Sequence, residues 1–155
     1  MTKKEDIYKI TSIVLILDQI IKIIVTHNMK LNTSIDIIPK FFSILYVQNT
    51  GAAFSILEDN TILLIIISAL FVVILDRYIK KEEKFTKLGV ISLGMIMGGI
   101  FGNLIDRILR HSVIDYLSFT VLKYNFPIFN LADIGITVGV GLYIISLILE
   151  RKTGK

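Results

Sequence analysis

Asp106, Asp115 and Asp133 lie near the ends of two long apolar runs. Two carboxyl groups that share one proton can hydrolyse an amide bond, because the ionised one activates water while the protonated one polarises the carbonyl. Asp106 stands beside Arg107 and four positions before Arg110, and these cations favour its charged form. Asp115 has apolar neighbours, which raise a carboxyl pKa, and Asp133 begins an apolar run. These settings favour Asp115 and Asp133 as the reactive pair.

Asp18 and Lys22 interrupt an apolar run that is otherwise typical of a membrane helix. Ionisable groups at such a depth cost roughly 2.5–3.5 kcal/mol each. Their spacing of four places them on one helical face, where they can pair. We interpret them either as a structural ion pair that orients the helix or as the polar wall of a site that opens outward.

Two further polar groups also have two interpretations. The third apolar run ends in a polar face made by Asn103, Asp106, Arg107 and Arg110. This face either fixes the helix end at the membrane interface or forms a wall of an active site. Asn130 and Asp133, three positions apart and shortly after a proline, also fit an ordinary helix N-terminus. On that pattern alone, capping is favoured over catalysis for Asp133.

Other chemistries lack the residues that they need. The chain has no cysteine, which excludes a thiolate nucleophile, a thiolate metal site and a disulfide. Its histidines, His27 and His111, have no metal-ligand spacing and no evident serine partner. We therefore expect no metal and no cofactor, because water is the attacking group. The net charge of +4 comes from basic clusters between apolar runs, so we expect no nucleic-acid partner.

The composition indicates a membrane protein. Of the 155 residues, 54% are hydrophobic and 19% are charged, and the mean hydropathy is +0.73. Apolar runs of about 20 residues cross a bilayer as helices, since lipid cannot satisfy backbone polar groups. We predict one membrane domain over residues 1–155, with spans at about residues 8–25, 60–79, 88–105 and 134–149.

Lysine and arginine are distributed unevenly along the chain. Eleven of the 17 lie in the N-terminal segment, in the loop between the second and third spans and in the C-terminal tail. Five lie in residues 27–59 and 106–133, the two remaining segments outside the spans. The positive-inside rule then places both termini in the cytoplasm and these two segments on the outer side of the membrane.

The outer segments contain strand patterns. Residues 34–38, 41–53 and 115–121 are rich in β-branched and aromatic side chains. The predicted fold class is therefore mostly α and integral to the membrane, with four transmembrane helices and a small extracytoplasmic β-sheet that forms a cradle on the helix ends.

Glycines recur at intervals of four in the third span, at Gly94, Gly98 and Gly102, with Gly99 beside them. Small residues on one face let another helix approach closely. We interpret these glycines as a packing surface without chemistry.

Five blocks of the sequence, taken together and in order, resemble the lipoprotein signal peptidase (signal peptidase II) family. They are residues 18–22 (DQIIK), 49–54 (NTGAAF), 98–107 (GGIFGNLIDR), 113–116 (VIDY) and 129–133 (FNLAD). The resemblance covers almost the whole chain, and five blocks on four spans of the right orientation are highly specific.

The resemblance implies an aspartic endopeptidase whose catalytic dyad is Asp115 and Asp133, which agrees with the pKa argument. It implies that the following residues bind substrate or support the site: Asn49, Gly51, Asn103, Arg107, Asn130, Asp18, Lys22 and Asp106. The implied substrates are prolipoproteins that carry diacylglycerol on a cysteine, cut just before that cysteine. The implied location is the bacterial inner or plasma membrane, in contact with its lipids, with the site at the outer face.

Two positions depart mildly from the family pattern. Ile134 follows the last catalytic aspartate where a hydroxyl residue is common, and Tyr116 replaces a common phenylalanine. The alternative function is a small non-enzymatic transporter or assembly subunit that uses the same carboxylates as ion or proton sites. Transport would favour charges at mid-membrane and usually a larger or repeated chain.

Overall fold

A computed structural model describes residues 3–51 and 60–153 of the chain. Its elements, in chain order, are α1 (Lys3–Asn28), β1 (Ser34–Ile38), β2 (Phe42–Asn49), α2 (Thr61–Lys81), α3 (Lys87–Arg110), β3 (Val113–Val121), β4 (Tyr124–Asn125) and α4 (Leu131–Thr153). All four helices are long and apolar enough to cross a membrane. The predicted fold class of four such helices and a small sheet is confirmed.

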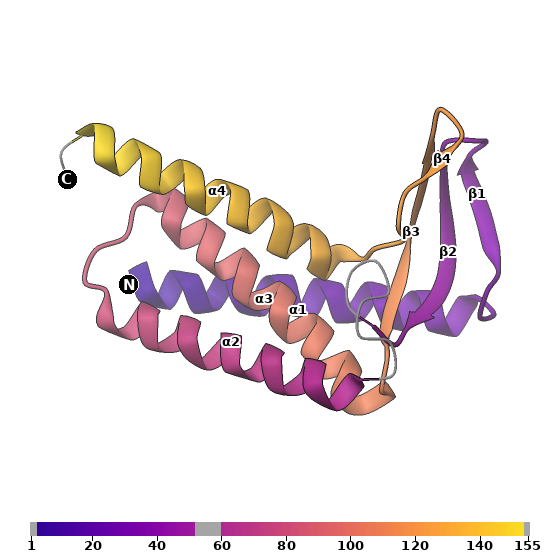
Figure 1. Ribbon diagram of the computed structural model, residues 1–155, viewed down its shortest axis with the longest axis horizontal. Helices are drawn as coiled ribbons and strands as arrows, with labels where there is room; N and C mark the ends of the chain where they lie inside the picture. Colours follow the sequence, from indigo (N-terminus) through magenta and orange to yellow (C-terminus); the bar gives the residue numbers. More distant parts are fainter. Residues whose placement is uncertain (1–2, 52–59, 154–155) are drawn as a thin grey trace.

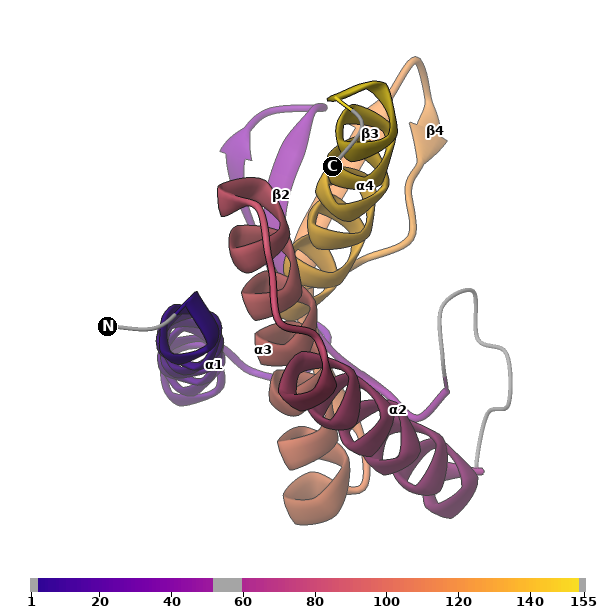
Figure 2. The same cartoon turned by 90° about the vertical axis from the view of Figure 1, so that its left-hand side faces the viewer.

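The helix α3 is the centre of the bundle, and the other three helices pack around it (Figures 1 and 2). In its most apolar window 67% of the residues are buried, against 11–22% in the other three helices. The outer faces of those helices expose large aliphatic side chains, such as Ile16 of α1 and Ile66 of α2. Because such faces are stable only in contact with lipid, the exposed surface agrees with a membrane location.

Glycines let α3 approach two helices closely, as predicted. A Cβ atom added at Gly98 would lie 2.7 Å from Cβ of Val14 and 2.8 Å from the main-chain oxygen of Thr11, both on α1. A Cβ atom at Gly99 would meet the main chain of Ala132 on α4. The glycine face therefore serves two interfaces and holds α1 and α4 near the same stretch of α3.

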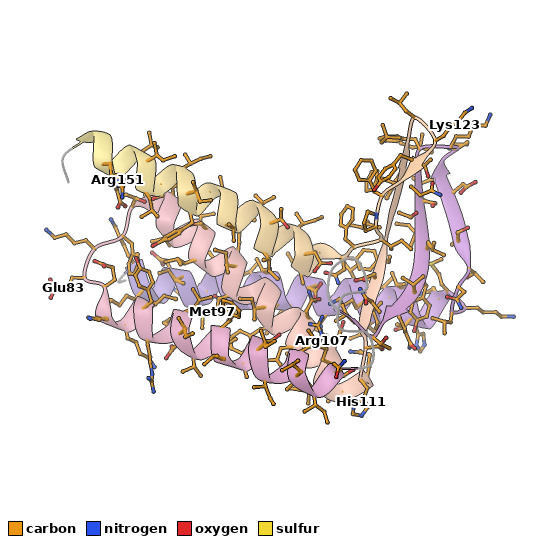
Figure 3. The ribbon with its side chains drawn as sticks, viewed as in Figure 1. Glu83, Met97, Arg107, His111, Lys123 and Arg151 are labelled. Atoms are coloured by element: carbon orange, nitrogen blue, oxygen red, sulfur yellow. The ribbon has the colours of Figure 1, made fainter. Side chains whose placement is uncertain are left out.

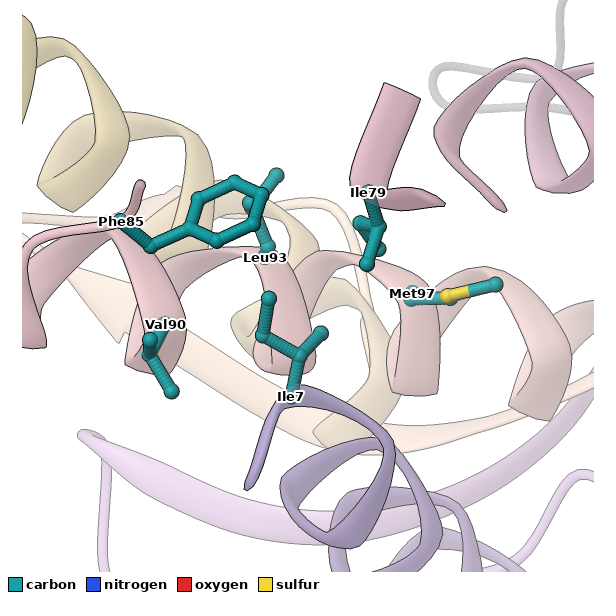
Figure 4. Close-up of a cluster of buried hydrophobic side chains, with 6 residues drawn as sticks. All are labelled: Ile7, Ile79, Phe85, Val90, Leu93 and Met97. Carbon is teal, nitrogen blue, oxygen red and sulfur yellow. The ribbon is translucent and has the colours of Figure 1, made fainter. Parts of the chain in front are cut away.

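Apolar packing holds the helices together at the end that is remote from the sheet. Figure 4 shows this cluster of buried side chains, which consists of Ile7, Ile79, Phe85, Val90, Leu93 and Met97. Its members come from the start of α1, the end of α2, the α2–α3 connection and α3. The start of α1, the end of α4 and this connection all lie at that end of the bundle (Figure 1).

The four strands form an antiparallel sheet in the order β1-β2-β3-β4, which stands at the opposite end of the bundle (Figure 1). β2 is shorter than the predicted strand over residues 41–53, and β3 begins at Val113, two residues earlier than predicted. The predicted residues 52 and 53, and the outer segment up to residue 59, lie outside the described residues. In the β2–β3 register Asn49 pairs with Val113 and Val47 with Asp115, so the sheet brings Asn49 close to Asp115.

Candidate active site

A cavity of about 800 Å³ lies at the junction of the bundle and the sheet. Its polar lining residues are Gln48, Asn49, Thr50, Asn103, Arg107, Asp115, Asp133 and Thr137. The rest of the wall is mostly apolar and comes from β2, β3, residues 126–129 and the first turns of α4. The predicted dyad, Asp115 and Asp133, therefore faces one cavity, at the end of the bundle that carries the sheet.

Asp115 is a buried carboxyl group with two amide donors. Only 3% of the residue is exposed. The side-chain nitrogen of Asn130 donates to its Oδ1 at 2.7 Å, and that of Asn49 donates to its Oδ2 at 3.0 Å. Burial raises the pKa of Asp115 to about 6, and the charge of Asp133 adds to the rise, although the two amide donors oppose it. Asp115 thus retains a proton at a pH at which an ordinary aspartate has lost it.

Asp133 is fixed by bonds to both of its oxygens. The side-chain nitrogen of Asn103 donates to Oδ1 at 2.8 Å, and the main-chain N–H of Asn130 donates to Oδ2 at 3.1 Å. The N–H of Asp133 in turn donates to Oδ1 of Asn130 at 3.0 Å. This reciprocal pair is the arrangement of a capping box. The capping interpretation is therefore correct, and it does not compete with a site role, because the capping carboxylate also lines the cavity.

The other free N–H groups at the start of α4 are satisfied from outside the helix. The N–H of Leu131 donates to the hydroxyl of Tyr116 at 3.2 Å, and that of Ala132 donates to Oδ1 of Asp18 at 3.0 Å. Unsatisfied N–H groups at a buried helix start are costly, so these bonds anchor α4 to β3 and to α1. The tyrosine that departs from the family pattern thus has a structural use for its hydroxyl.

Lys22 is the centre of a buried ion cluster that lies behind the cavity wall. Its Nζ is 2.9 Å from Asp18 Oδ2 and 2.8 Å from Asp106 Oδ2, and all three side chains are fully buried. Arg110 completes the cluster at 2.7 Å from Asp106 Oδ1. The ion-pair interpretation of Asp18 and Lys22 is confirmed. The cluster supports the site from behind, since the cavity wall itself is formed by other residues.

Arg107 has a different environment from its neighbours in the cluster. It lines the cavity, and its Nη2 donates to the main-chain oxygen of Gly51 at 3.1 Å. Its Nε is buried and has no hydrogen-bond partner among residues 3–51 and 60–153. Gly51 in turn donates its N–H to Oδ1 of Asn49 at 2.9 Å. Figure 3 shows Arg107 at the junction of helices and sheet. Of the two arginines that Asp106 could anchor, it anchors Arg110.

The apolar wall was not predicted from the sequence. Residues 126–129 and Ile134, Ile136 and Val138 form this wall. Ile136 and the polar lining residue Thr137 lie three and four positions after Asp133, so the helical period could have placed them on the same side of α4. No comparable periodicity marks residues 126–129, because a loop has none.

Fold and site together define a multi-pass membrane protein with two carboxyl groups in an amide-lined cavity at one end of its bundle. Residues 10–149 match the family model of signal peptidase (SPase) II, so the chain belongs to the signal peptidase II family. A similar curated protein is a lipoprotein signal peptidase of Symbiobacterium thermophilum, 42% identical over 142 residues, which are 92% of this chain and 93% of the relative.

Two solved structures have the same fold. Both are bacterial membrane enzymes studied by the in meso method, at 2.3 Å and 1.9 Å resolution. The first has a TM-score of 0.86 and 34% identity, over 94% of this chain and 89% of that one. The second has a TM-score of 0.80 and 35% identity, over 89% of each chain. The chain is thus a multi-pass bacterial membrane protease, and nothing in these comparisons favours the transporter interpretation.

Proposed function

We propose that this protease removes the signal peptide from diacylglyceryl-modified prolipoproteins, with Asp115 and Asp133 as an aspartic dyad. The observation that carries the proposal is the shared cavity, in which two carboxyl groups are held by amide donors and one of them has a raised pKa. The membership of the signal peptidase II family supports the substrate class.

The chemistry needs one proton on the dyad. The ionised carboxylate accepts a proton from water while the water oxygen attacks the scissile carbonyl carbon. The protonated carboxyl group gives its proton to the carbonyl oxygen. As the tetrahedral intermediate collapses, the C–N bond breaks, the leaving amine takes a proton from one carboxyl group of the dyad, and a hydroxyl proton of the intermediate returns to the other. Burial makes Asp115 the better holder of the starting proton. All atoms come from water and substrate, so no cofactor takes part.

The cavity suits a substrate that is itself an apolar helix. The turn of α4 after Asp133 presents Ile134, Thr137 and Val138, and the segment before α4 adds Phe126 and Ile128. A signal peptide could therefore approach between helices while its acyl chains remain in lipid. Asn49 and Arg107 stand at the polar part of the wall, where their side-chain N–H groups can donate to the substrate main chain.

The first test is cleavage of a defined substrate. Purified protein in lipid or detergent is expected to cut a diacylglyceryl-modified prolipoprotein just before the lipidated cysteine. The mass of the larger product should then match a chain that begins at that cysteine. The same prolipoprotein without lipid is the control and is expected to remain intact.

A chelator is expected to leave the rate unchanged, because carboxylates activate the water. Loss of activity with the chelator, restored by one metal ion, would contradict the aspartic mechanism.

The orientation in the membrane is a second expectation. The sheet and the cavity lie at the end of the bundle opposite to the α2–α3 connection (Figure 3). This connection is one of the segments rich in lysine and arginine that are expected in the cytoplasm. Because the chain has no cysteine, single replacements report cleanly. Lys84→Cys is expected to resist an impermeant thiol reagent in intact cells, whereas Lys123→Cys is expected to react. After permeabilisation both should react, and the reverse pattern in intact cells would invert the proposed topology.

A further inference from the structure

Lys22 reaches the dyad through a single amide. Besides its two carboxylate partners, its Nζ donates to Oδ1 of Asn103 at 3.0 Å. The same oxygen accepts from Nδ2 of Asn130 at 3.1 Å, and Nδ2 of Asn103 donates to Asp133 at 2.8 Å. Asn103 thus connects a fully buried ammonium group to one carboxylate of the dyad.

Two donors hold the Asn103 oxygen and so fix the direction of this connection, Nζ of Lys22 and Nδ2 of Asn130. A carboxamide can turn so that its oxygen and nitrogen exchange places, and only its partners decide between the two orientations. An ammonium group has donors and no acceptor, so it holds the oxygen of Asn103 toward itself. The nitrogen must then face Asp133. The amide of Asn130 is oriented in the same way by another group that can only donate, the main-chain N–H of Asp133.

We infer that Lys22 is a positioning residue, which holds the Asn103 amide in the orientation that donates to Asp133. This inference rests on the proposed aspartic mechanism. It assigns to Lys22 a task beyond neutralising Asp18 and Asp106, and that task can be separated experimentally from the charge.

Two double variants differ only in whether position 22 can donate. In Lys22→Met/Asp18→Asn one charge of each sign is removed, so the cluster stays balanced between Asp106 and Arg110. The oxygen of an asparagine at position 18 can still accept the N–H of Ala132. Lys22→Gln/Asp18→Asn has the same charge and keeps a donor for Oδ1 of Asn103. A purely electrostatic or packing role of Lys22 predicts equal behaviour of the two.

The positioning role predicts a difference in rate and in pH profile. Without the Lys22 donor, Nδ2 of Asn130 is the one described partner left to hold the Asn103 oxygen, so the amide can turn that oxygen more readily toward Asp133, where it repels the carboxylate. In the Met variant kcat/KM is therefore expected to fall by about 100-fold. The acid limb, which is the rise of kcat/KM with pH on the acid side of its pH profile, is expected at a higher pH than in wild type. The Gln variant should keep the wild-type acid limb and most of the rate. The other charged or titratable groups around Asp133 are Arg107 on α3, Asp115 and Tyr116 on β3; they are identical in both variants.

Arg110→Gln is the matched single control, since it also removes a cation paired with Asp106 but does not touch Asn103. It should keep the wild-type acid limb, because the Asn103 amide keeps its orientation, even where loss of one cation from the cluster lowers stability and rate. Equal rates and equal acid limbs in the Met and Gln variants would overturn the inference. If the Met variant does not fold, a shifted acid limb in the folded Gln variant overturns it as well.

Asp115→Asn is measured alongside to separate this inference from the proposed mechanism. If Asp115→Asn still cleaves, the dyad is wrong. An inactive Asp115→Asn with indistinguishable Met and Gln variants refutes the role of Lys22 alone.

Discussion

Asp115→Asn and Asp133→Asn are each expected to lower prolipoprotein cleavage by about 1,000-fold or more while a folded protein remains in the membrane. Asparagine preserves the size of the side chain and one of the two hydrogen bonds that each carboxylate accepts. It removes the shared proton, however, so that water activation and carbonyl polarisation can no longer occur together. The measurement is the cleavage rate beside a thermal unfolding scan of each variant.

The double variant and Asp106→Asn serve as controls for this prediction. Because the dyad acts as one unit, the double variant should be scarcely worse than either single one. Asp106 lies in the ion cluster, where it contacts Lys22 and Arg110. Its replacement should cause only a partial loss of activity, together with reduced stability. A fully stable but inactive Asp106→Asn, combined with turnover by Asp115→Asn, would show that the wrong carboxylate had been chosen.

Much of the fold follows from local patterns in the sequence. The four apolar runs predict the four helices, because length and hydropathy are what the bilayer selects. The glycine spacing of Gly94, Gly98 and Gly102 predicts a helix contact on one face. The ends of elements are less predictable: α3 continues to Arg110, five residues past its apolar run. Its polar last turn is held by partners in the ion cluster, and hydropathy contains no information about such partners.

The site was predicted less completely than the fold. The dyad could be chosen from the setting of Asp115 and from the family pattern, but the sequence did not reveal what holds it. Asp18 bonds to Ala132 across 114 positions, and Lys22 bonds to Asn103 across 81. Contacts of this kind depend on how the helices are rotated against each other, and that rotation is decided by packing over the whole bundle.

Capping and catalysis were alternatives for Asp133 as long as only the spacing of Asn130 and Asp133 was known. In the structure Asp133 caps the helix through Oδ2, accepts from Asn103 through Oδ1 and also lines the cavity. A helix start is rigid, since its N–H groups fix the side chains that cap it. Placing a reactive carboxylate in a capping box therefore orients it without a dedicated scaffold, which is the preorganisation that a catalytic group needs.

The second large effect concerns stability and pH. Burial, with a contribution from the charge of Asp133, raises the pKa of Asp115 from its ordinary value of 3.8 to about 6 in the folded protein. Between these values the folded state binds the proton more tightly than the unfolded state, so the free energy of unfolding falls as the pH rises. The shift corresponds to about 3 kcal/mol, fully lost once the pH is above about 6. At neutral pH the fold is therefore weakened by the buried carboxylate of Asp115.

Asp115→Asn should remove this pH dependence. Relative to wild type, its free energy of unfolding in detergent micelles is expected to rise by about 2 kcal/mol between pH 4 and pH 7, because asparagine does not titrate. Asp133→Asn is the matched control: it removes the charge near Asp115 but leaves the burial, which is the larger cause, so the fall should persist in reduced form. The measurement is the free energy of unfolding of wild type and of both variants at several pH values. An unchanged fall in Asp115→Asn would show that another group is responsible, and Asp115 would then no longer be the better holder of the proton that the proposed hydrolysis requires.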